Sequence, residues 1–146
     1  MHQSRSKTRS IAATLVAAGA VAADAIAPAA AATGCSDPAF QKAEVAAVAQ
    51  RTNAIGAAYV QNYRLAAAAS FIGWRTTISA RVPCSPQLRN VRTHLLRNLG
   101  DLWRSYTATA AGDTIDGLSW LALASTEAAR ANAGLIIFNR EMRPPG

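Results

Sequence analysis

The sequence predicts an all-α protein, an up-and-down helical bundle that follows an N-terminal secretory signal. Three observations favour this fold class. Alanine, the strongest helix former, supplies 35 of the 146 residues. A capping residue followed by proline, a typical start of a helix, occurs twice. Apolar side chains then recur every three or four residues, as they do on one face of a helix.

The first 32 residues have the pattern of a secretory signal. Three basic residues and no acidic residue occupy the first ten positions, and a run of small apolar residues follows as far as Ala23. This run is shorter than the roughly 20 apolar residues that a transmembrane helix needs. We expect cleavage after Ala32, which leaves a single domain of 114 residues (146 minus 32) spanning 33–146. We expect no transmembrane helix in the chain.

The chain has two cysteines, Cys35 and Cys84. Two cysteines in an exported protein usually form one bridge, so we predict a disulfide between them. Cys35 also follows the small residue Gly34 close to the expected cleavage site, where lipoproteins are cut and acylated. The signal predicts a secreted or envelope-associated protein, and the alternative is a lipoprotein anchored to the membrane surface through Cys35.

The stretch from Asp37 to Ala80 forms either one long helix or two shorter ones. It starts with Asp37 as the expected N-cap and proline in the first turn. An unbroken helix would be roughly 64 Å long at about 1.5 Å per residue. The two cysteines would then be far apart, although a disulfide needs Cα atoms within about 7 Å. We therefore prefer two antiparallel helices that break at 53–56, where a turn former and a glycine occur together.

This break gives a bundle of four helices, and a bundle of three helices with one long member is the alternative. The apolar row expected to face the core in the first region consists of Val45, Val48, Thr52, Ile55, Tyr59 and Tyr63.

Two more helices are expected after the proline at position 83. Ser85 and Pro86 start the first of them, which carries the clearest apolar stripe in the chain. This stripe consists of Leu88, Val91, Leu95, Leu99, Leu102 and Tyr106. Gly112 ends that helix, and Asp113 or Thr114 starts the last one. The apolar row expected on the last helix consists of Leu118, Leu121, Ser125, Ala128 and Leu135, and a short disordered tail follows it.

Composition and motifs exclude several classes of protein. Hydrophobic residues make up 51% of the chain and charged residues 16%, which excludes an intrinsically disordered protein. His94 is the only histidine in the predicted mature chain, which excludes a histidine-rich metal site. No nucleophile elbow, phosphate-binding loop or dinucleotide fingerprint occurs. We therefore expect a non-enzymatic binding protein with no catalytic residue and no metal.

The predicted mature chain is basic. It has 12 basic residues (15 minus three in the signal) and 7 acidic ones (8 minus one), a formal net charge of +5. Arg89, Arg97 and Arg104 fall on the face opposite the apolar stripe. This basic stripe is either a solvated helix face or a surface that attracts an anionic partner, such as lipid headgroups or acidic envelope polymers. No nucleic-acid-binding motif is visible, so nucleic acid is not an expected partner.

Tyr59, Tyr63 and His94 form a candidate ligand site. The two tyrosines are four residues apart, so one helix would place them on the same side, and His94 would approach from another helix. Phenolate and imidazole both bind haem iron. The simpler interpretation is that both tyrosines belong to the core row, with their hydroxyls at its rim.

The segment from Cys35 to Tyr63 resembles the small exported haemophores of actinobacteria. These are helical, have two cysteines, and place a tyrosine on the first helix with a second ligand four residues later. Here Tyr63 stands where that family has histidine, and the following proline is missing. The resemblance implies haem capture with Tyr59 as the ligand, which makes a carrier of haem or another hydrophobic ligand the alternative function.

Overall fold

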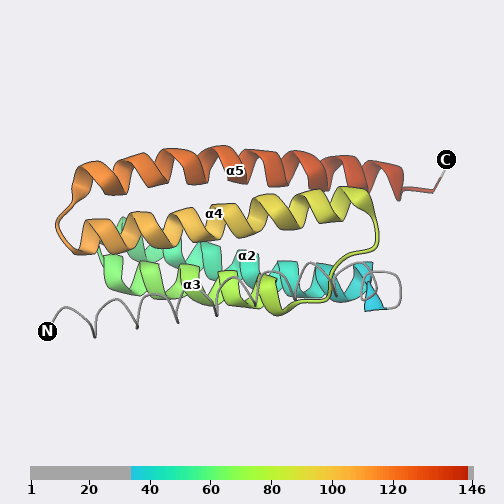
Figure 1. Ribbon diagram of the computed structural model, residues 1–146, viewed down its shortest axis with the longest axis horizontal. Coiled ribbons are helices and arrows are strands. Elements are labelled where there is room, and N and C mark those ends of the chain that lie inside the picture. Colours follow the sequence, from blue (N-terminus) through green and yellow to red (C-terminus); the bar gives the residue numbers. More distant parts are fainter. Residues whose placement is uncertain (1–33, 145–146) are drawn as a thin grey trace, which may run out of the picture. The chain divides into compact units, whose positions relative to one another are not determined.

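The computed structural model describes residues 34–144, which contain four α-helices and no strand. These helices are α2 (Asp37–Tyr59), α3 (Tyr63–Ser79), α4 (Pro86–Ala110) and α5 (Thr114–Glu141). Successive helices run in opposite directions (Figure 1). The prediction of an all-α, four-helix bundle is therefore confirmed. The secretory signal predicted for residues 1–32 lies outside the described residues.

The start of α2 is held by side-chain caps, but the N-cap is Ser36 and not Asp37. The Ser36 hydroxyl accepts a hydrogen bond from the amide of Ala39. One carboxylate oxygen of Asp37 instead accepts from the amides of Cys84, at 2.6 Å, and Ser85, at 3.0 Å. Asp37 thereby ties the start of α2 to the connection between α3 and α4.

The two cysteines of the chain, Cys35 and Cys84, are both disulfide-bonded. The predicted bridge is therefore confirmed. A sulfur held in a disulfide is not available for acylation, so the structure favours the bridge over the lipoprotein alternative.

The predicted reversal between the first two helices exists, but it lies later in the chain than expected. Residues 53–56 are helical, and the turn spans 60–62. Gln61 adopts the left-handed conformation with φ of 61°, which glycine and asparagine adopt more readily. The Asn62 side chain caps α3 by accepting from the amide of Leu65. Glutamine is a weak turn signal, which explains why the pattern favoured a break at 53–56, where asparagine and glycine occur together.

The bundle is open on one side. The central helix α4 packs against both α3 and α5, whereas α2 packs mainly against α3. In this described part of the chain, no Cα atom of α2 or α3 lies within 8 Å of one in α5. Figure 1 shows the resulting layers, with α5 on one side of α4 and the pair of α2 and α3 on the other. A closed bundle would bring α2 and α5 together, and here their backbones do not meet.

The core consists of the apolar stripe of α4 and the small residues that surround it. All six predicted stripe residues of α4 are buried. The rows predicted for the other helices are confirmed only in part. Val45 is 67% and Leu118 60% exposed, whereas half-buried members of the rows pack against the core clusters. These half-buried members are Val48, Tyr63, Leu121 and Leu135. The residues that α2 buries are Phe40, Ala47, Ala54 and Ala57. The residues that α5 buries are Gly117, Ala124, Ala131, Gly134 and Phe138.

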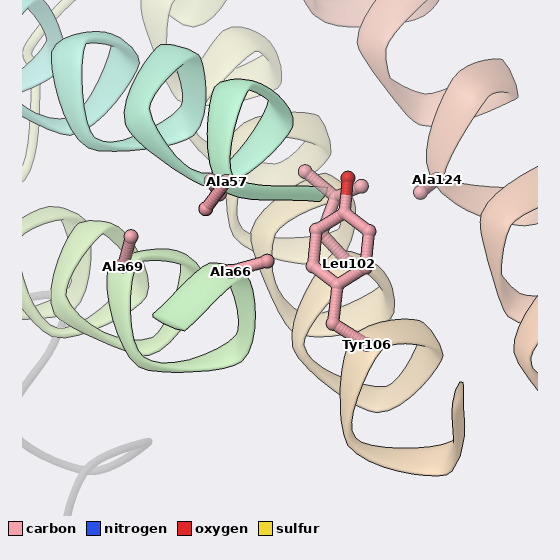
Figure 2. Close-up of a cluster of buried hydrophobic side chains, with 7 residues drawn as sticks. Ala57, Ala66, Ala69, Leu102, Tyr106 and Ala124 are labelled. Atoms are coloured by element: carbon pink, nitrogen blue, oxygen red, sulfur yellow. The ribbon is translucent and has the colours of Figure 1, made fainter. Parts of the chain in front are cut away.

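Small residues take these buried positions because the helices approach closely. Figure 2 shows alanines of α2, α3 and α5 around Leu102 and Tyr106 of α4. A Cβ atom added at Gly117 would lie 2.2 Å from the Thr109 hydroxyl oxygen and 3.1 Å from the carbonyl oxygen of Ser105. A larger side chain at this crossing requires Thr109 to change its rotamer or the two helices to move apart.

Candidate functional site

A groove with a volume of about 520 Å³ lies where the bundle is open. Its lining comes from α2, α4 and α5, together with Tyr63, the first residue of α3. The lining residues are Arg51, Ile55, Ala58, Tyr59, Tyr63, Asn98, Leu102, Tyr106, Leu121, Ala124, Ser125 and Ala128. We call this hollow the α2–α5 groove.

A smaller hollow of about 140 Å³ shares Arg51 and Ala128 with the groove. Its other lining residues include Glu44 of α2 and Leu135 of α5. Beyond it, Phe40 of α2 and Phe138 of α5 belong to one buried cluster with Leu88 and Val91 of α4. This cluster closes the space between α2 and α5 at the end of the bundle near the disulfide.

The walls of these two hollows are the apolar rows that the sequence pattern assigned to the core. Val48, Ile55 and Tyr59 come from the row predicted on the first region. Leu121, Ser125, Ala128 and Leu135 come from the row predicted on the last helix. The two apolar faces therefore exist, but α2 and α5 do not pack against each other along them, so part of each face is left uncovered. An uncovered apolar surface of this kind is typical of a binding site.

Two polar atoms in the groove lack partners among the described residues. Asn98 is 2% exposed, and its side-chain nitrogen donates to the carbonyl oxygen of Ala124 at 2.7 Å. Its side-chain oxygen is buried without a hydrogen bond, and so is Nε of Arg51. An unsatisfied buried polar atom costs about 1–3 kcal/mol. A ligand that satisfied both atoms would recover part of that cost.

Arg51 is the only charged residue among the described residues that line the α2–α5 groove. Glu44 lines the smaller hollow, which also contacts Arg51. Burial raises the pKa of the Glu44 carboxyl, and the positive charge of Arg51 opposes this effect. At the far end, Tyr106 stacks on Tyr63 with ring centroids 6.5 Å apart. Burial, with a smaller contribution from Tyr63, raises the pKa of Tyr106, so its phenol is neutral at pH 7.

The structure brings only part of the predicted tyrosine and histidine site together. Tyr59 and Tyr63 both line the groove, but they do not belong to one helix, because α2 ends at Tyr59 and α3 begins at Tyr63. Tyr59 is 90% exposed. His94 is not among the residues that line the groove, because its ring pairs with the Glu127 carboxylate of α5. This hydrogen bond from His94 is the main cause that lowers the pKa of Glu127.

The three residues of the predicted basic stripe are exposed, and two of them have partners in the chain. Arg89 donates from Nε to the carbonyl oxygen of Pro83 at 3.0 Å. Arg104 forms an ion pair with Asp101 at 3.5 Å and lies 4.7 Å above the ring of Trp120. Arg97 is exposed on the same helix. The attraction of this stripe to anionic envelope components stays a prediction.

Arg51 and Asn98 both line the groove, and neither was predicted as a site residue from the sequence. One sequence signal could have identified Asn98 as a buried polar residue: it lies within the apolar stripe, three residues after Leu95. A residue at this spacing faces the core, where a buried amide needs a partner. No sequence signal distinguishes Arg51, because an arginine four residues before Ile55 on a helix is ordinarily interpreted as a solvent-exposed side chain.

Comparisons with known proteins give no match, either to a family model, to a curated protein or to a solved structure. None of the helices within residues 34–144 is long and apolar enough to cross a membrane. The fold and the site together define the class as a small four-helix protein with an apolar groove on its open side.

Proposed function

We propose that this chain is an exported, non-enzymatic binding protein that carries an elongated apolar ligand in the α2–α5 groove. The observation that carries the proposal is that two apolar helix faces line one uncovered groove. Its volume of about 520 Å³ falls within the range of about 300–1,000 Å³ that is usual for small-molecule sites. The bridge between Cys35 and Cys84 supports export, because disulfides persist in oxidising compartments.

A ligand thinner than a helix fits this groove best. An α-helix with its side chains is about 10–12 Å across. The cluster that contains Phe40 and Phe138 closes one end of the groove, so a partner helix has no open channel along the full length of α2 and α5. An acyl chain or a similar slender apolar molecule needs only the part between the cluster and the tyrosines.

Titration with the neutral fluorescent probe N-phenyl-1-naphthylamine tests the proposal. The wild-type protein should increase the emission of the probe, because the dye leaves water for an apolar groove. Ala128→Trp places an indole between α2 and α5 and should weaken probe binding about tenfold, or 1.4 kcal/mol. The control is Ala122→Trp, on an exposed position of the same helix. Probe binding that is absent, or equal in the two variants, would refute a ligand site in the groove.

Haem is the second candidate ligand, and the position of Tyr59 and Tyr63 favours it. Both phenols line the groove, and tyrosine is a known ligand of haem iron. Hemin added to the purified protein should then shift its Soret band, and the double variant Tyr59→Phe/Tyr63→Phe should abolish the shift. An unshifted band would exclude haem and leave the proposal of an apolar ligand standing.

A further inference from the structure

We infer that the ligand of the α2–α5 groove is an acyl amphiphile whose headgroup carries both an anionic oxygen and an N–H or O–H donor, held between Arg51 and Asn98. This inference rests on the proposed function. It adds the chemistry of the headgroup, whereas the proposal concerns only the apolar part of the ligand. An N-acylated amino acid is the simplest molecule with this combination of groups.

The anionic oxygen is inferred from Arg51. This residue is half-buried against apolar groove walls, and no carboxylate of the described residues lies within 4 Å of its guanidinium nitrogens. A guanidinium in such surroundings binds a carboxylate or phosphate strongly, because little water competes for its donors. Glu44 interacts with Arg51 from the smaller hollow, which leaves the side toward the larger groove for a ligand.

The hydrogen-bond donor is inferred from Asn98. The amide of Asn98 has a fixed orientation, because its nitrogen donates to Ala124 on α5. Its oxygen is therefore the atom without a partner, and an oxygen can only accept. A bare carboxylate offers no donor and would be repelled by this oxygen. A headgroup with an amide N–H or a hydroxyl next to its acid satisfies both residues.

The position of the ligand's acyl chain follows from the apolar residues that line the groove. Ile55, Leu102 and Leu121 line the same hollow as Arg51, and Tyr63 and Tyr106 lie at its far end. A headgroup at Arg51 therefore leaves these walls to the acyl chain. Burial of each methylene adds roughly 0.8 kcal/mol, so affinity should grow with chain length until the groove is filled.

Displacement of N-phenyl-1-naphthylamine by four amphiphiles with equal dodecyl-type chains tests the inference. The ligands are N-lauroylglycine, laurate, methyl laurate and dodecyltrimethylammonium, all used below their micelle or solubility limits. We expect N-lauroylglycine to bind best, laurate about tenfold more weakly, methyl laurate more weakly again, and the cation least. Laurate and its methyl ester differ in charge and both lack a donor, whereas N-lauroylglycine and laurate differ in the added amide.

Two groove variants separate the two contributions. Arg51→Gln should remove the preference for laurate over methyl laurate, and Asn98→Leu should remove the preference for N-lauroylglycine over laurate. Arg75→Gln is the matched control, because it makes the same change in net charge at an exposed site on α3, outside the groove and outside the basic stripe. Circular dichroism of each variant establishes that the helices are intact. If Arg51→Gln does not fold, Arg51→Lys, which keeps the charge but loses the planar fork, should reduce the preference in part.

The outcomes distinguish a wrong headgroup from a wrong function. If the probe binds the wild type and all four amphiphiles displace it equally, the headgroup inference is wrong and the apolar groove remains. The same conclusion follows if Arg75→Gln changes the preference as much as Arg51→Gln. If the probe does not bind at all, the proposed function itself fails.

Discussion

The side-chain amide of Asn98 on α4 donates a 2.7 Å hydrogen bond to the backbone carbonyl of Ala124 on α5. The same side chain has a buried oxygen without a partner in the described residues. Asn98 therefore belongs both to the α4–α5 interface and to the lining of the groove. Its side-chain nitrogen has a hydrogen-bond partner and its side-chain oxygen has none among the described residues.

This combination predicts that Asn98 adds less to stability than its burial suggests. Asn98→Ala should lower the free energy of unfolding by about 1–3 kcal/mol, because it removes the hydrogen bond and leaves a cavity. Asn98→Leu should cost less, because it fills the space and removes the unsatisfied oxygen. Urea unfolding measures both changes. A loss as large for leucine as for alanine would mean that the amide is kept for stability rather than for binding.

Glycine at the α4–α5 crossing should be irreplaceable. Gly117→Ala brings a methyl group within 2.2 Å of the Thr109 hydroxyl oxygen and should destabilise the fold by about 1–3 kcal/mol. Gly56→Ala is the matched control, since it lies in α2 with nothing within 4 Å of the new methyl group. That change should stabilise the protein by about 0.5–1 kcal/mol, because glycine is a poor helix former. Thermal unfolding of the pair should show shifts of opposite sign.

Reduction of the disulfide should destabilise the protein markedly. The bridge links positions 35 and 84, and a loop of this length contributes roughly 4 kcal/mol in the chain-entropy model. The double variant Cys35→Ser/Cys84→Ser should reproduce the loss, and adding reductant to it should have no further effect. Denaturant midpoints with and without reductant measure the difference. Equal midpoints for oxidised and reduced wild type would contradict a stabilising bridge.

Intact mass of the protein collected outside the cells checks its processing. Cleavage after Ala32 predicts a chain of 114 residues (146 minus 32). Reduction should raise its mass by about two units, one for each thiol formed. An added acyl mass would instead identify a lipoprotein.

The pair of His94 and Glu127 predicts a loss of stability in acid. The hydrogen bond from His94, aided by the charges of His94, Arg130 and Arg97, holds the pKa of Glu127 below its ordinary value of 4.5. The stabilisation is therefore present above that value and is lost as pH falls through the lower pKa of the folded state. Glu127→Gln should make stability less dependent on pH between about pH 5 and pH 3.

Denaturant midpoints across this pH range measure the effect. Burial raises the pKa of Glu44 and Asp101, so these groups change stability in the opposite direction. The test is therefore the difference between wild type and variant, rather than the slope of the wild type alone. Parallel curves for the two proteins would show that the pair does not stabilise the fold.

The sequence by itself determined the helical class, the starts of α4 and α5, and the buried stripe of α4. It did so because these features are local. Proline with a capping residue fixes a helix start, and bulky side chains at regular spacing mark a buried face where the other face is polar. The disulfide could also be predicted from the sequence, because a chain with two cysteines has one possible pairing within itself.

The tertiary structure alone decided which faces of α2 and α5 are buried. With 35 alanines in the chain, a row of alanine and glycine does not stand out from the sequence, whereas Ile55 and Leu121 do. The helices pack through their small residues, because these permit the closest approach of the backbones. Some of the large apolar residues, Ile55 and Leu121 among them, are therefore left to line the groove. The site could not be predicted for the same reason, since Arg51 of α2 and Asn98 of α4 line one groove only because α2 and α5 do not pack against each other.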